Sequence, residues 1–176
     1  MKNIVLIGMS GVGKTQKGKY IARRRGMDYL DTDTAIVQQE GISIDEIFIR
    51  FGEDSFRSIE EAIIKDLSRL ENTLISAGGG IVLRKANMDS LKANSFIVYL
   101  KGDINTIVNN LKRSKTIRPL LKNSEDLYKS VSELYMSRQA LYKLYSHITV
   151  DIEDKSIEDI YNEVLKGYNE YITCGK

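Results

Sequence analysis

The feature that most constrains this chain is a glycine-rich stretch near its N-terminus. Residues Gly8 to Thr15 read Gly-Met-Ser-Gly-Val-Gly-Lys-Thr and fit the spacing G-x-x-x-x-G-K-[ST]. The stretch follows the apolar run Ile4 to Ile7 and precedes a helical pattern, so it is predicted to join a buried strand to a helix. Glycines there let the backbone turn successive N–H groups inward, and the helix adds its positive N-terminal end. The stretch is therefore predicted to cradle phosphate groups.

The last two residues of this loop suit a nucleoside triphosphate. Lys14 can reach the β- and γ-phosphates, and the Thr15 hydroxyl can bind the Mg²⁺ that bridges them. A glycine-rich turn without a ligand would leave the Lys-Thr pair unexplained. The expected nucleotide contacts from the loop are Gly8, Ser10, Gly11, Val12, Gly13, Lys14 and Thr15.

The composition gives no support for several classes of partner. The 176 residues are 42% hydrophobic, which is ordinary for one globular domain, and the formal net charge is +2. Bulk charge therefore gives no support for binding to nucleic acid or to a membrane. The single cysteine, Cys174, excludes an intrachain disulfide, and the apolar run after Lys2 is too short for a secretion signal. We expect a cytoplasmic monomer whose partners are small molecules.

Strand-like and helix-like segments alternate along the chain, which predicts an α/β fold with a parallel sheet covered by helices on both faces. Residues 1–176 are expected to form one domain. The expected strands are 2–7, 27–30, 73–76, 96–100 and 147–150. The expected helices are 14–25, one after Ser43 that Gly52 breaks, 53–70, 87–93, 103–113, 125–145 and a terminal helix with apolar residues from Ile157 to Tyr168.

Residues 114–126 are polar and are interrupted by Pro119, so they are predicted to form a loop or a mobile lid. Arg118 lies in this segment. An arginine that arrives when a lid closes can stabilise a transferring phosphoryl group while water is excluded.

Two carboxylates follow the second expected strand. Ligands of open α/β sheets bind beyond the carboxyl ends of the strands, where Asp31, Asp33 and the run Gly78 to Gly80 are expected to lie. Close carboxylates are costly unless a cation is near, and Mg²⁺ held by Thr15 and the phosphates would supply one. Asp31 is then a candidate for the outer shell of the metal, and Asp33 for holding or deprotonating an acceptor hydroxyl. Alternatively, Asp33 caps the next helix and Asp31 is solvated.

Two arginines on expected helices are candidates for binding an anion. Arg57 has Glu60 and Glu61 one turn on, which also fits an ordinary surface ion pair. Arg138 lies on an apolar stripe, where an unpaired guanidinium is expensive and calls for an anion. Its long side chain could instead extend to water. The stripe consists of Leu134, Tyr135, Leu141 and Tyr142.

Taken together, these residues resemble the shikimate kinase family over nearly the full chain. The loop alone occurs in many proteins, whereas the complete set in this order and spacing is specific. The set is Gly8 to Thr15, Leu30 to Asp33, Gly52-Glu53, Phe56-Arg57, Glu60, Gly78 to Gly80, Arg118 to Leu121, and Arg138 before Leu141-Tyr142.

The resemblance implies a nucleoside-monophosphate-kinase-like fold with a five-stranded parallel sheet in the order 2-3-1-4-5. It implies transfer of the ATP γ-phosphoryl group to the 3-hydroxyl of shikimate, in the pathway to chorismate and the aromatic amino acids. Lys14 and Arg118 would stabilise that group, while Thr15 and Asp31 would hold Mg²⁺. A helical segment of about residues 33–62 would bind the acceptor. The implied shikimate contacts are Asp33, which is also catalytic, Arg57, Gly78, Gly79, Gly80 and Arg138.

The chain departs from the family pattern on the nucleotide side. Gln16 stands where a small hydroxyl residue is common, and Lys112 and Arg113 form a basic pair near the usual adenine-side arginine, of which we favour Arg113. Two other functions fit the loop: a related small-molecule kinase such as a gluconate kinase, and a nucleotide-dependent switch. Arg57 and Arg138 favour an acceptor that bears a carboxylate.

Overall fold

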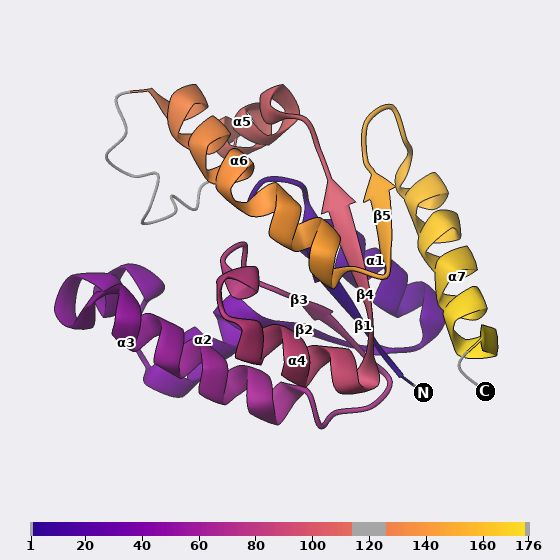
Figure 1. The fold of residues 1–176 in the computed structure, drawn as a ribbon, viewed down its shortest axis with the longest axis horizontal. Helices are drawn as coiled ribbons and strands as arrows, with labels where there is room; N and C mark the ends of the chain where they lie inside the picture. The colour runs from indigo at the N-terminus through magenta and orange to yellow at the C-terminus, as the bar shows by residue number, and fades with distance from the viewer. Residues whose placement is uncertain (1, 114–125, 175–176) are drawn as a thin grey trace.

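A parallel sheet of five strands forms the centre of the protein (Figure 1). The computed structural model describes residues 2–113 and 126–174. The strands follow the order β2-β3-β1-β4-β5, and each neighbouring pair is parallel, which confirms the expected order. They are β1 (Asn3–Ile7), β2 (Asp28–Asp31), β3 (Thr73–Ser76), β4 (Ser95–Lys101) and β5 (Ile148–Asp151).

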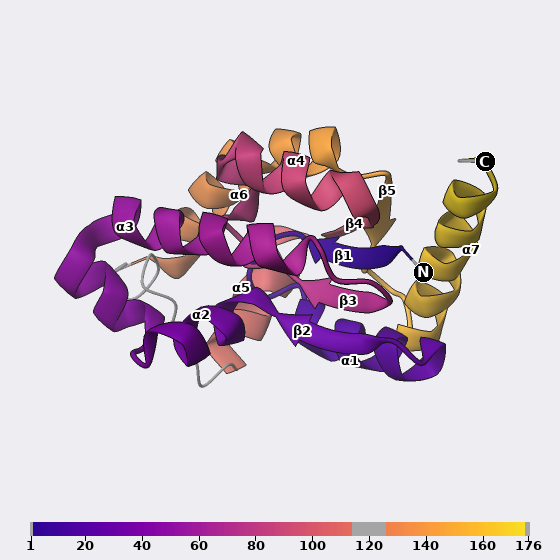
Figure 2. The ribbon, with the colours of Figure 1, turned by 90° about the horizontal axis from the view of Figure 1, so that it is seen from below.

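Helices cover both faces of this sheet. Figure 2 shows α4 and α6 on one side and α1 on the other, where α7 packs against α1. The helices are α1 (Lys14–Arg25), α2 (Thr32–Glu40), α3 (Ile44–Leu67), α4 (Lys85–Asn94), α5 (Ile104–Arg113), α6 (Leu127–Tyr145) and α7 (Ile157–Cys174), with a 3₁₀ turn η1 (Ile81–Leu83). No helix in the described ranges is both long enough and apolar enough to cross a bilayer.

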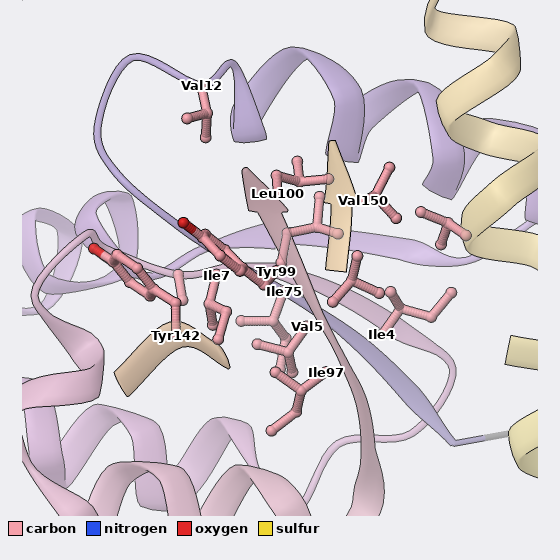
Figure 3. Close-up of a cluster of buried hydrophobic side chains, with 14 of the residues drawn as sticks. Ile4, Val5, Ile7, Val12, Ile75, Ile97, Tyr99, Leu100, Tyr142 and Val150 are labelled. Atoms are coloured by element: carbon pink, nitrogen blue, oxygen red, sulfur yellow. The ribbon is translucent and has the colours of Figure 1, made fainter. Parts of the chain in front are cut away.

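Strand β1 is the most enclosed part of the core, because it lies between β3 and β4 and helices cover both of its faces. Ile4 pairs with Leu74 on one side and Phe96 on the other, and all five residues of β1 are buried. Figure 3 shows Ile4, Val5 and Ile7 among the side chains of the neighbouring strands. This packing holds the carboxyl end of β1, and the glycine loop after it, at the middle of the sheet.

The glycine loop needs its glycines for two separate reasons. Gly8, Gly11 and Gly13 have φ angles of 141°, 95° and 78°, which L side chains rarely adopt. A Cβ atom on Gly8 would also lie 2.5 Å from the Leu100 carbonyl oxygen. The loop is therefore compressed against the end of β4, and Gly13 caps α1 in the left-handed conformation.

The region after β2 differs in part from the sequence expectation. Helix α2 is absent from the expected helix ranges, although the expected helical segment of about residues 33–62 covers it, and the second half of α3 ends at Leu67 instead of Leu70. The break at Gly52 is confirmed as a kink within α3 (φ 78°, ψ 174°), and Ser43 and Glu46 form the expected capping box. The predicted lid at 114–126 lies outside the described residues except for Asp126, whose carboxylate accepts from the Lys129 N–H at 3.1 Å and caps α6.

Candidate active site

The carboxyl ends of β2, β3 and β1 bring three distant segments to one edge of the sheet, because neighbouring parallel strands end side by side. Two adjoining pockets open there. The loop pocket is lined by Ser10, Gly11, Gly13, Lys14, Thr15, Gln16, Lys17, Asp31, Asp33, Ser76, Ala77 and Asn110. The arginine pocket is lined by Met9, Ser10, Asp33, Ile44, Phe48, Phe56, Arg57, Glu60, Gly78, Gly79, Gly80, Leu134 and Arg138. Ser10 and Asp33 belong to both pockets.

Lys14 lies across the glycine loop. Its ammonium group donates to the carbonyl oxygens of Gly8 at 2.8 Å and Met9 at 2.9 Å, and the residue is only 8% exposed. This cation lies at the N-terminus of α1, where negative charge is stabilised. The loop pocket therefore has the chemistry of a polyphosphate site.

Asp31 divides its two carboxylate oxygens between two tasks. Oδ1 accepts from the N–H groups of Asp33 at 3.1 Å and Thr34 at 3.2 Å, so Asp31 caps α2. Oδ2 lies 3.3 Å from the Thr15 hydroxyl and 3.4 Å from the Tyr29 hydroxyl. The alternative in which Asp33 caps this helix is wrong. The Asp33 side chain instead lines both pockets.

The Thr15 and Asp31 oxygens fit a hard cation such as Mg²⁺, which prefers oxygen ligands and keeps several of its waters. Over residues 2–113 and 126–174, no group of three or more His, Cys, Asp or Glu side chains could hold a metal ion. A site with so few protein ligands suits a cation that is bound mainly through phosphates and water.

The glycines after β3 are required by the side chains that approach them. A Cβ on Gly78 would lie 2.6 Å from Asp33 Oδ1, and a Cβ on Gly80 would lie 2.5 Å from Arg57 Nη2. The Gly78 N–H also donates to the Thr32 hydroxyl at 2.9 Å. These glycines therefore allow a carboxylate and a guanidinium to lie against the backbone.

Arg57 forms a buried ion pair, so the alternative of an ordinary surface pair is wrong. The residue is 6% exposed, and it donates to Glu53 at 3.0 Å and to Glu60 at 3.1 Å. Burial raises the pKa of the Glu60 carboxyl above its usual value, although Arg57 acts in the opposite direction. Glu61 points elsewhere and pairs with Arg84 at the surface.

Arg138 is also buried, and the alternative in which it reaches water is wrong. It is 7% exposed, and its Nη1 donates to the Gly79 carbonyl oxygen at 3.4 Å. In the described part of the chain no carboxylate forms an ion pair with it, although Arg138 acts from nearby to lower the pKa of Glu60. Part of the remaining wall is apolar and includes Phe48 and Phe56, whose rings lie 4.8 Å apart. The arginine pocket therefore suits a small anion with an apolar face.

Sequence reasoning missed several of the residues that line these pockets. Asn110 donates to the Gly11 carbonyl oxygen at 2.8 Å, and only the contact between α5 and the loop reveals it. Phe48 could have been suspected because it lies on the same helix as Phe56, which belongs to the set that resembles the family, on the other side of the Gly52 kink. Arg113 is exposed and does not line the loop pocket, and Arg118 lies outside the described residues.

Comparisons with known proteins point to one family. The family model described as Shikimate kinase matches residues 10–169. A shikimate kinase of Caldanaerobacter subterraneus subsp. tengcongensis is 40% identical over 168 residues, which is 96% of each chain. The solved shikimate kinase from Acinetobacter baumannii in complex with shikimate superposes with a TM-score of 0.91 at 29% identity, over 97% of this chain and 94% of that one.

A gluconokinase from Sinorhizobium meliloti shares the fold only. It superposes with a TM-score of 0.61 at 20% identity, over 98% of this chain and 97% of that one. The match of the family model over most of the chain, together with the relative at 40% identity, separates this protein from that branch of the fold. This chain, with its two buried arginines, its glycines after β3 and its glycine loop, therefore belongs to the shikimate kinase family.

Proposed function

We propose that this protein transfers the γ-phosphoryl group of ATP to the 3-hydroxyl of shikimate, which yields shikimate 3-phosphate and ADP. One observation carries the proposal: the loop pocket and the arginine pocket meet at Ser10 and Asp33. A phosphoryl donor on one side and a carboxylate-bearing acceptor on the other would have their reacting groups at this junction. Phosphoryl transfer depends mostly on positioning and charge stabilisation, which such a junction provides.

The loop pocket would bind the triphosphate. The N–H groups of Gly11, Val12 and Gly13 and the ammonium of Lys14 would hold its phosphates, together with Gly8 and Ser10. Thr15 and Asp31 would hold Mg²⁺, which when bound offsets negative charge on the β- and γ-phosphates. Arg113 as an adenine-side contact and Arg118 as a second cation on the transferring group stay predictions.

The arginine pocket would bind shikimate. Arg57 and Arg138 would take its carboxylate with guanidinium donors, beside the backbone of Gly78, Gly79 and Gly80. The apolar wall would pack against the ring carbons. Asp33 would accept a hydrogen bond from the 3-hydroxyl and hold it in line with the donor, as a general base or as an orienting group. Residues 33–62, which span α2 and most of α3, would thus form the acceptor-binding segment.

We also propose the setting of this enzyme. A monomer in the cytoplasm, without a nucleic-acid or membrane partner, agrees with the net charge of +2 and the single cysteine. The residues 114–126 would act as the lid of this single domain.

A coupled assay of ADP formation tests the reaction. We expect ADP release to depend strongly on shikimate and weakly on gluconate or other hydroxylated acids at the same concentration. Equal rates with and without shikimate would support a nucleotide-dependent switch instead, and preference for gluconate would support the related kinase.

A matched pair of arginine variants on α3 tests the site. Arg57→Met should raise the KM for shikimate by about 10-fold or more, because a charge-assisted contact to a carboxylate contributes about 1.5–3 kcal/mol. Arg50→Met is the control, since Arg50 pairs with Glu46 at the surface and both side chains are well exposed. Equal effects of the two substitutions would remove Arg57 from the acceptor site.

A further inference from the structure

Tyr142 lies one turn after Arg138 on α6, and both side chains donate a hydrogen bond to the same carbonyl oxygen. The hydroxyl donates to the Gly79 carbonyl oxygen, to which Arg138 Nη1 also donates at 3.4 Å. A backbone carbonyl oxygen has two lone pairs, so it can accept both hydrogen bonds. Two donors from one helix thus hold one carbonyl of the glycine run.

Fixing that carbonyl also fixes the N–H on the other side of the same peptide bond. The bond between Gly79 and Gly80 is planar and trans, so the Gly80 N–H points away from the donors on α6. Among the residues with described positions, no acceptor is bonded to this N–H. Both glycines line the arginine pocket beside Arg57 and Arg138. The orientation of this peptide therefore bears on how an anion is held there.

The tyrosine itself is held firmly. Tyr142 is fully buried, and its ring stacks on Tyr99 (Figure 3), with centroids 5.1 Å apart. Its hydroxyl lies 3.7 Å from the sulfur of Met9 in the glycine loop. Burial raises the pKa of Tyr142 to about 12, so the hydroxyl stays protonated and remains a donor at neutral pH.

We propose that Tyr142 is a positioning residue for the binding of shikimate. Its hydroxyl fixes the orientation of the Gly79–Gly80 peptide and, through the Gly79 carbonyl oxygen, the guanidinium of Arg138. The inference rests on the proposed function, since it concerns how the same pocket holds a carboxylate. Tyr142 does not line the arginine pocket, so it acts only through these neighbours. A change at Tyr142 should therefore affect the binding of shikimate more than the binding of ATP.

The test compares Tyr142→Phe with Tyr99→Phe. Each substitution keeps a stacked aromatic ring and removes one buried hydroxyl, and the Tyr99 hydroxyl lies near Tyr135 and, within the described residues, makes no bond to the glycine run. For Tyr142→Phe we expect the KM for shikimate to rise about 5- to 30-fold, because a buried acceptor loses a donor. The kcat and the KM for ATP should change less than about twofold, and Tyr99→Phe should match the wild type.

Thermal unfolding gives a second readout. At one fixed concentration, shikimate should raise the Tm of the Tyr142→Phe protein by less than it raises the Tm of the wild type. The increase in Tm caused by a fixed concentration of ATP should be the same in both. An unchanged KM for shikimate, an equal rise in the KM for ATP, or the same effect from Tyr99→Phe would overturn the inference. If the wild type forms ADP regardless of shikimate, the proposed function fails and the inference fails with it. If the wild type depends on shikimate and Tyr142→Phe matches it, only the inference fails.

Discussion

The Arg57 guanidinium lies 3.1 Å from the Glu60 carboxylate, and both side chains are almost fully buried. Glu60 also accepts from the Asn87 side chain at 3.4 Å, whereas the second partner of Arg57, Glu53, is half exposed. Glu60 is thus the inner support of Arg57. Removal of one member of a buried pair leaves the other charge uncompensated, which costs far more than loss of a surface pair.

Glu60→Ala should therefore impair both stability and acceptor binding. We expect a loss of about 2–3 kcal/mol in the free energy of unfolding, at or below the low end for broken buried pairs, because Arg57 keeps Glu53. The KM for shikimate should rise as Arg57 loses its fixed orientation. Urea unfolding and steady-state kinetics measure the two effects. The neighbouring Glu61→Ala is the control, since the exposed Glu61–Arg84 pair should contribute less than about 1 kcal/mol. Equal losses from both variants would contradict this assignment.

Adding a methyl group to Gly80 should displace Arg57 without unfolding the protein. The new Cβ would meet Arg57 Nη2 at 2.5 Å and Nη1 at 2.6 Å, and the end of a long side chain can move aside. Gly80→Ala should raise the KM for shikimate by about 10-fold, since it weakens a charge-assisted contact. Gly78→Ala would instead meet Asp33 Oδ1 at 2.6 Å and should lower kcat. Kinetics in which both variants change the same parameter would disagree with this division of roles.

Lys14→Met should abolish phosphoryl transfer while the protein folds normally. The substitution removes the cation that lies over the glycine loop, and the loop conformation itself is set by the glycines. We expect a fall in kcat of at least about 100-fold, in the range for removal of one transition-state contact. Circular dichroism should show an unchanged fold. A fully active Lys14→Met protein would remove this residue from the mechanism.

Asp33→Asn should separate catalysis from nucleotide binding. Asp33 lies at the junction of the two pockets, and its replacement removes the negative charge that would hold or deprotonate the acceptor hydroxyl. Activity should fall by about 100-fold or more, while calorimetry should show ATP binding close to that of the wild type. Lost ATP binding with intact shikimate binding would place Asp33 on the donor side.

The only histidine in the chain gives stability a pH dependence. His147 Nδ1 accepts from the Ile97 N–H at 2.9 Å, and burial, with Lys92 nearby, lowers the pKa of this imidazole below its ordinary 6.5. Because the unfolded chain takes up the proton first, this contribution is complete above pH 6.5 and is lost as the pH falls toward the lower, folded pKa.

An NMR titration of the His147 ring should show a midpoint below 6.5. The Tm should fall between pH 7.5 and the region below that midpoint, and this part of the decrease should be missing in His147→Gln. A ring that titrates at or above 6.5 would contradict the assignment.

Much of the local structure could be predicted because its causes lie close together in sequence. The glycine loop after β1, the capping box of Ser43 and Glu46 and the break at Gly52 each depend on residues within a few positions of one another. The start of α2 could not be fixed from the sequence, because its cap is Asp31, the last residue of β2, whereas the cap could be read equally well at Asp33.

By itself, the sequence indicated the glycine loop, the order of the strands and of most helices and, through its resemblance to a family, the order of the sheet. The residues that would bind each substrate stay predictions. The tertiary structure alone decided which of these residues are buried and which lie together. Arg57 and Arg138, 81 positions apart, line one pocket because α3 and α6 both reach the carboxyl edge of the sheet. The physical reason is that backbone conformation follows from neighbouring residues, whereas burial and charge pairing depend on contacts between distant segments of the chain.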